Sequence, residues 1–95
     1  AKHKVSFSGV MTIFTALECK EKYFELIENA PAIQSDLAGV EDIDSSGIQV
    51  MLKAKQLAES LGKSLVIENS SASIQSVFSL YGLDEESFNY DNVNP

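Results

Sequence analysis

The segment Asp44-Ser45-Ser46-Gly47 combines a carboxylate, two hydroxyls and a glycine at a predicted strand-to-helix junction. Ser46 and Gln49 have the spacing of a capping box, which satisfies free backbone N–H groups at a helix start. If Ser46 caps the helix, Ser45 lies just outside it with a free hydroxyl. A phosphate on Ser45 would add a charge of about −1.5 to −2 at the positive end of the helix, whose free amides could accept it. The segment is therefore either a helix cap, which is the more common case, or a phosphorylation switch.

The neighbours of Ser45 suit contact with another protein. Asp44 supplies a fixed negative charge, so that a second negative group would change the local field sharply. Gly47 is predicted to leave room for the backbone of a partner. We expect a protein partner to contact five consecutive residues here, namely Asp44, Ser45, Ser46, Gly47 and Ile48.

Other chemistry has weaker support in the sequence. A serine nucleophile needs a nearby base, and nothing places His3, the only histidine, beside a serine. The chain has one cysteine, Cys19, and one histidine, too few for a structural transition-metal site. Asp36, Asp42 and Asp44 could gather near a strand end and suit magnesium, but solvated loop acids are the commoner case. No glycine-rich phosphate loop is present. We therefore predict no catalytic activity, no metal and no cofactor.

Alternating strands and helices must position this segment. Each predicted helix has an apolar stripe at helical spacing, and Cys19 lies on the first stripe, where a packing thiol is expected. Thr15 and Glu18 form a second predicted capping box, and Gly62 and Gly82 are predicted to end helices. The predicted strands are 4–7, 32–37 and 64–68, and the predicted helices are 15–29, 46–61 and 71–81, followed by a short turn in 84–90 and a frayed tail, 91–95. Helical crossovers favour parallel strands, so we expect an α/β fold in a single domain, 1–95.

The composition excludes several classes of partner. The 95 residues include 14 acidic and 7 basic side chains, a net charge of −7. Binding to nucleic acid or to anionic lipid needs a basic face. A single cysteine fits a reducing compartment, and no apolar run approaches the ~20 residues of a membrane span. No secretory signal pattern occurs at the N-terminus. We expect a cytoplasmic protein without nucleic-acid binding or membrane insertion.

Three stretches resemble STAS domains, the fold of bacterial anti-sigma-factor antagonists. They are Asp36–Gln49 (DLAGVEDIDSSGIQ), Gly62–Ile67 (GKSLVI) and Ser76–Leu83 (SVFSLYGL). The resemblance covers most of residues 5–83 and implies a small STAS-type fold, with helices packed on a mostly parallel or mixed sheet of about four strands. In the antagonist branch, the serine after the aspartate, here Ser45, is phosphorylated by a kinase that is itself the anti-sigma factor, and phosphatases reverse this. The resemblance thus implies a non-catalytic phosphoprotein of signal transduction and transcription regulation.

Two departures from the antagonist pattern leave other roles open. Antagonists usually carry an acidic pair after the glycine of the early strand, whereas Val10, Met11 and Thr12 follow Gly9 here. The segment before Gly9 is also short, so we expect that an N-terminal strand of the antagonist pattern is absent or trimmed. Similar domains act with response regulators in chemotaxis or biofilm signalling, or as subunits that clasp the ATPase of lipid-transporting ABC complexes. A nucleotide or small-molecule sensor, using the helix starts at Ser46 and Ser71, is a further alternative.

Overall fold

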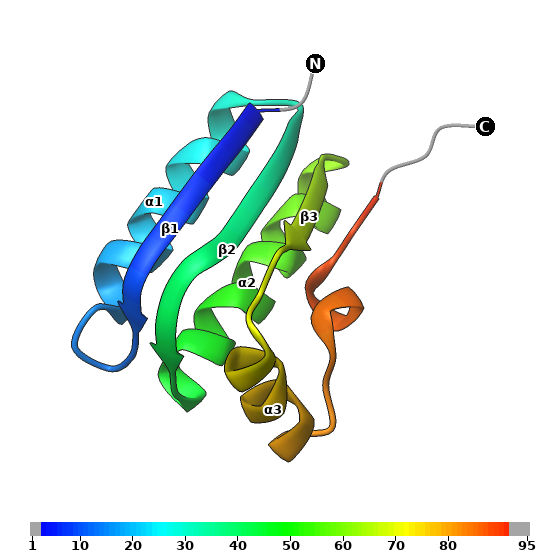
Figure 1. Cartoon of the computed structure of the whole chain (residues 1–95). Coiled ribbons are helices and arrows are strands. Elements are labelled where there is room, and N and C mark those ends of the chain that lie inside the picture. Colours follow the sequence, from blue (N-terminus) through cyan, green and yellow to red (C-terminus); the bar gives the residue numbers. More distant parts are fainter. Residues whose placement is uncertain (1–2, 92–95) are drawn as a thin grey trace.

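The computed structural model describes residues 3–91, and it confirms the predicted alternation of strands and helices (Figure 1). The sequence between Gly62 and Leu83 folds largely as its pattern predicts, and so do the two long helices before it. The elements are β1 (His3–Met11), α1 (Ala16–Asn29), β2 (Ala32–Ile43), α2 (Ser45–Leu61), β3 (Ser64–Glu68), α3 (Ala72–Leu80) and the short 3-10 helix η1 (Glu85–Phe88).

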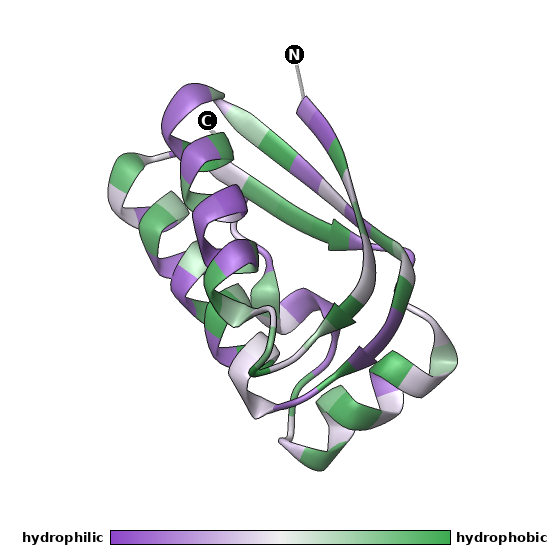
Figure 2. Cartoon of the chain, turned by 90° about the vertical axis from the view of Figure 1, so that its left-hand side faces the viewer, coloured by the Kyte–Doolittle hydropathy of each residue, from purple (hydrophilic) through white to green (hydrophobic). Residues whose placement is uncertain are grey.

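The three strands form one parallel sheet in the order β1-β2-β3. Helices α1 and α2 cover one face of the sheet, and α3 lies on the other side near one end (Figure 2). Because β1 and β2 are parallel, with Met11 opposite Ile43, the loop after β1 and the start of α2 emerge at the same edge. About four strands were expected. Within residues 3–91 there are three, and the edge of β3 carries a single isolated antiparallel bridge in place of a fourth strand. This bridge joins Leu65 to Tyr90 through hydrogen bonds of 2.7 and 2.8 Å.

Strands β1 and β2 are longer than their sequence pattern predicts. Gly9 does not end β1, because its φ of +76° and register shifts on both sides of it let the strand continue to Met11. Such bulges absorb an extra residue while the neighbouring strand stays paired. Strand β2 likewise continues past Leu37 to Ile43. Both strands therefore reach the start of α2. If β1 ended at Gly9, it would stop short of α2.

The core lies between the sheet and the α1–α2 layer. Tyr23 of α1 is fully buried, stacks on Phe7 of β1 at 4.4 Å between ring centroids, and shares a 2.8 Å hydrogen bond with the buried Ser35 of β2. Cys19 is buried in the same layer, as its place on the apolar stripe predicted. On the other side of the sheet, Phe78 of α3 packs against Phe88 of η1 at 4.8 Å. These contacts join every layer of the fold.

Several helix ends follow the sequence, but the start of α1 does not. Gly62 ends α2 in the left-handed conformation at φ +66°, and the Ser71 hydroxyl accepts from the Ile74 N–H at the start of α3. The capping box predicted for Thr15 and Glu18 is wrong, because the Thr15 side chain makes no cap hydrogen bond. Its hydroxyl donates to the Val10 carbonyl at 2.8 Å instead, and so closes the loop between β1 and α1.

The C-terminal segment is more ordered than expected at its first residue. Asp91 accepts a 3.0 Å hydrogen bond from the Ser64 hydroxyl, so the predicted fraying does not begin there. The rest of the predicted tail, 92–95, lies outside the described residues.

Among the helices that the structure describes, none is long and apolar enough to cross a membrane.

Candidate functional site

Asp44, rather than Ser46, caps helix α2. One Asp44 carboxylate oxygen accepts from the N–H groups of Ser46 and Gly47 at 2.8 and 3.2 Å, and helix α2 begins at Ser45. The prediction that Ser46 and Gln49 form a capping box is therefore wrong. Aspartate and serine are both good caps, and the residue with extended backbone just before the helix takes the role.

Asp44 also ties together two loops that are distant in sequence. Its second carboxylate oxygen accepts from the Ile13 N–H at 3.0 Å, and its own N–H donates to the Met11 carbonyl at 3.3 Å. Desolvation raises the pKa of Asp44, but the N–H groups of Ile13, Gly47 and Ser46 outweigh it and hold the pKa below the ordinary 3.8. Asp44 is therefore ionised at neutral pH and holds the β1–α1 loop beside the start of α2.

This cap makes a prediction for acid stability. Because the pKa of Asp44 is lower in the folded chain than the ordinary 3.8, its contribution to stability is present above that value and is lost as pH falls below it. Asp44→Asn keeps a carbonyl acceptor but does not titrate. Urea unfolding between pH 7 and pH 2.5 should show the wild type more stable at pH 7, with the gap between the two proteins closing below pH 4. A gap that stays constant with pH would exclude this role for the carboxylate.

Ser45 is the first residue of α2, and its side chain is exposed. Within residues 3–91 its hydroxyl makes no hydrogen bond. The adjacent Ser46 is less accessible than Ser45, because it is half-buried. The expectation that Ser45 lies just outside the helix is wrong, because Asp44 and not Ser46 is the cap. The expectation that its hydroxyl is free is confirmed. The hydroxyl is therefore accessible while the helix stays folded. The amides of Ser46 and Gly47, however, already bind Asp44, so they are not free to accept a phosphate as the sequence suggested.

Gly47 and Ile48 face inward, which corrects their expected contact with a partner. Gly47 is buried, and a Cβ there would overlap the Met11 carbonyl oxygen and lie 2.8 Å from Cγ1 of Ile43. Its lack of a side chain thus makes room for the end of β1, not for another protein. Ile48 is 3% exposed and belongs to the core. The accessible part of the predicted contact segment is Asp44, Ser45 and Ser46.

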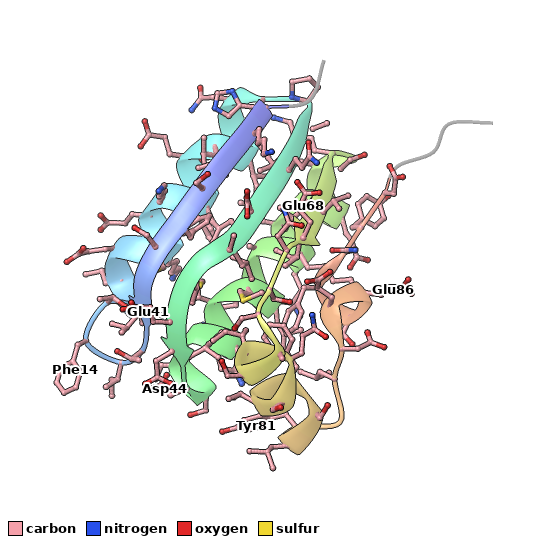
Figure 3. All side chains as sticks on the ribbon, viewed as in Figure 1. Phe14, Glu41, Asp44, Glu68, Tyr81 and Glu86 are labelled. Atoms are coloured by element: carbon pink, nitrogen blue, oxygen red, sulfur yellow. The ribbon has the colours of Figure 1, made fainter. Side chains whose placement is uncertain are left out.

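An apolar surface beside Ser45 was missed by the sequence interpretation. Ile13, Phe14 and Leu17 are 68, 90 and 68% exposed, and the Ile13 backbone is the group bound to Asp44. Phe14 and Tyr81 both lie at the end of the molecule that carries Asp44 (Figure 3). Two adjacent large apolar residues in a short connection, Ile13 and Phe14, are the signal that could have indicated it.

The remaining candidate residues do not assemble into a catalytic or metal site. His3 begins β1 opposite Ile33, at the far end of the sheet from Ser45. Asp36 and Asp42 each accept a backbone N–H close in sequence, from Ala38 and Ile43 respectively. Among residues 3–91, no three His, Cys, Asp or Glu side chains are placed to share a metal ion. The chemistry of this end of the domain is therefore an exposed hydroxyl beside an ionised carboxylate.

Comparison with protein families identifies the fold. Residues 1–90 match the family model described as "Mlab, STAS domain". The chain belongs to the STAS family. The α/β architecture of this STAS domain, with its parallel sheet and three α-helices, is that of the family. No curated protein sequence matches it significantly.

Three solved structures share the fold at low sequence identity. The anti-sigma factor antagonist SpoIIAA in its unphosphorylated form has a TM-score of 0.65 and 17% identity, over 83% of this chain and 74% of that one. The phosphorylated form of the Bacillus cell fate determinant SpoIIAA has a TM-score of 0.66 and 19% identity, over 86 and 76%. A sulfate transporter family protein from Wolinella succinogenes has a TM-score of 0.72 and 18% identity, over 90 and 73%. At these identities the likeness establishes the STAS fold.

Proposed function

We propose that this STAS domain is a non-catalytic switch protein that binds a regulatory protein through the surface around Ser45 and is controlled by phosphorylation of Ser45. The observation that carries the proposal is the exposed, unbonded Ser45 hydroxyl at the first position of a helix capped by another residue. Such a hydroxyl can be modified while the cap stays intact. Partners of this kind are a serine kinase, an anti-sigma factor or a response regulator, together with a phosphatase.

The charge around Ser45 explains how a phosphate would act. Asp44 is ionised, and its carboxylate already binds the Ser46 and Gly47 amides. A phosphate on Ser45 adds a charge of about −1.5 to −2 beside it, and the positive end of the helix dipole offsets part of the repulsion. The added charge therefore lies on the surface and changes what a partner meets there. The unphosphorylated and the phosphorylated SpoIIAA structures both share the fold of this chain, which supports a phosphate carried without a change of fold.

Phosphorylation of Ser45 is tested first on the native protein. The intact mass of protein purified from its host should show a phosphorylated fraction that Ser45→Ala abolishes. Modification confined to other residues would contradict the assignment of Ser45.

Partner binding is tested by co-purification with wild type, Ser45→Ala and Ser45→Asp in parallel. Ser45→Asp should lower recovery of the partner at least ~10-fold, equivalent to about 1.4 kcal/mol, because it mimics part of the phosphate charge. The matched control is Ser73→Asp, which adds the same charge to the exposed first turn of α3. Equal loss in both variants would show a general charge effect and not a switch at Ser45.

A second candidate is a constitutive STAS subunit of a larger complex, such as a lipid-transport ABC system or a signalling scaffold. The matching family model, "Mlab, STAS domain", and the structural likeness to a sulfate transporter family protein favour it. In this case Ser45 is only part of the loop. Stable co-purification with an ATPase that Ser45→Asp leaves unchanged would support this candidate over the switch.

A further inference from the structure

A shallow groove between α1 and α2 is apolar inside and basic at its edge. It has a volume of about 350 Å³ and is lined by Ala16, Leu17, Lys20, Ser46, Gln49, Val50 and Lys53. None of these residues is acidic, although the chain has a net charge of −7. In the described part of the chain Lys53 has no ion pair or hydrogen bond, and the Lys20 ammonium lies 5.4 Å from the centroid of the Phe24 ring. We call this surface the α1–α2 groove.

A second surface has the opposite character. Leu80 and Tyr81 at the end of α3 are 83 and 52% exposed. The exposed acids Asp84 and Glu86 follow within six residues of Leu80, and the Glu86 side chain points outward (Figure 3). The Glu86 carboxylate makes no hydrogen bond or ion pair with residues 3–91. We call this surface, Leu80–Glu86, the α3 ridge.

We propose that the α1–α2 groove binds the α3 ridge of a second copy of this chain, with Leu80 and Tyr81 in the groove and Glu86 facing Lys53. The groove volume is near the low end of the ~300–1,000 Å³ of ligand pockets, which suits one or two side chains and not a whole domain. Burial of the two apolar side chains supplies the attraction. The opposite charges at the edges set the orientation.

The positions of the two surfaces determine what such a contact builds. The groove lies between α1 and α2. The ridge begins at the end of α3, on the other side of the sheet (Figure 2), and continues into η1, which packs beside β3 and α2. A contact between two different surfaces leaves one groove and one ridge free in each pair, so that association continues beyond the dimer, as an open chain or until a ring closes. The contact is weak, because a few side chains bury far less than the ~800 Å² per partner of stable complexes and because the copies repel through their net charge. We expect a dissociation constant of about 0.1–1 mM.

Charge reversal separates this contact from general repulsion. Lys53→Glu makes the net charge more negative and Glu86→Lys makes it less negative. The proposed contact requires both single variants to associate less than wild type, whereas net charge alone would make Glu86→Lys associate more. Added salt is a poorer test, because it weakens the Lys53–Glu86 attraction and the overall repulsion together.

Sedimentation velocity of the purified chain between ~10 µM and ~1 mM measures the association. Wild type should show a concentration-dependent rise in weight-average mass, and each single variant should remain monomeric. A 1:1 mixture of Lys53→Glu and Glu86→Lys should associate again, and so should the double variant, whose net charge returns to −7. Leu80→Ser, a neutral change at an exposed site, should reduce association without altering charge. A monomeric wild type at ~1 mM, or Glu86→Lys that associates as well as wild type, would overturn the proposal.

Discussion

Replacement of Gly47 by alanine is expected to destabilise the domain by about 3–5 kcal/mol, a large part of the ~5–15 kcal/mol that holds a domain of this size together. The new Cβ would overlap the Met11 carbonyl oxygen and approach Cγ1 of Ile43 to 2.8 Å. Both are fixed by the sheet, since Met11 and Ile43 are partners at the end of β1 and β2. The start of α2 must move away from β1, which also strains the Asp44 contacts to Met11 and Ile13.

Thermal unfolding provides the measurement for Gly47→Ala. At about 4–8 °C per kcal/mol, the expected fall in melting temperature is roughly 12–40 °C. Ser46→Ala is the matched control, because it adds no atom and lies at the preceding position of the same helix turn. It removes a hydroxyl that has no hydrogen bond within residues 3–91. The control should change stability by less than ~0.5 kcal/mol. A Gly47→Ala protein as stable as the control would mean that β1 and α2 are not in close contact.

Tyr23→Phe is expected to destabilise the domain by about 1–3 kcal/mol although it removes a single oxygen. The Tyr23 hydroxyl and the Ser35 hydroxyl are each other's partners at 2.8 Å, and both residues are fully buried. The phenylalanine ring keeps the stacking on Phe7, so the loss isolates the effect of leaving the Ser35 hydroxyl unpaired. Ser35→Ala should destabilise the domain by a similar amount, because it leaves the Tyr23 hydroxyl unpaired.

A double-mutant cycle by urea unfolding tests this pair. Tyr23→Phe with Ser35→Ala leaves no unpaired hydroxyl, so the double variant should lose less stability than the two single variants together. Additive losses would contradict a shared hydrogen bond.

The buried Tyr23 hydroxyl also predicts how stability changes at alkaline pH. Desolvation raises the pKa of Tyr23 well above the ordinary 10.0, despite the Ser35 hydrogen bond, so wild type should lose stability above pH 10 relative to Tyr23→Phe.

The local patterns of the sequence determined the order of elements and the position of Ser45. Apolar stripes at helical spacing predicted all three helices, and Gly62 and Ser71 marked ends that the structure confirms. These signals depend on residues within a few positions of one another, so they can be interpreted without knowledge of the fold. The STAS family was predicted from three stretches and is confirmed by the family match.

The details of the site were decided by contacts between distant segments. Asp44, Ser45 and Ser46 are all good caps by residue type, and the Ile13 N–H, 31 residues away, helps to hold Asp44 in that role. Gly47 is needed because Met11 passes close to it, and Ile48 points into the core for the same packing reason. Residue types along the chain located a helix start within Asp44-Ser45-Ser46-Gly47 but did not decide which residue caps it. Only the packing of β1 against α2 decided which groups around Ser45 are buried, bound or exposed, because that packing joins residues more than thirty positions apart.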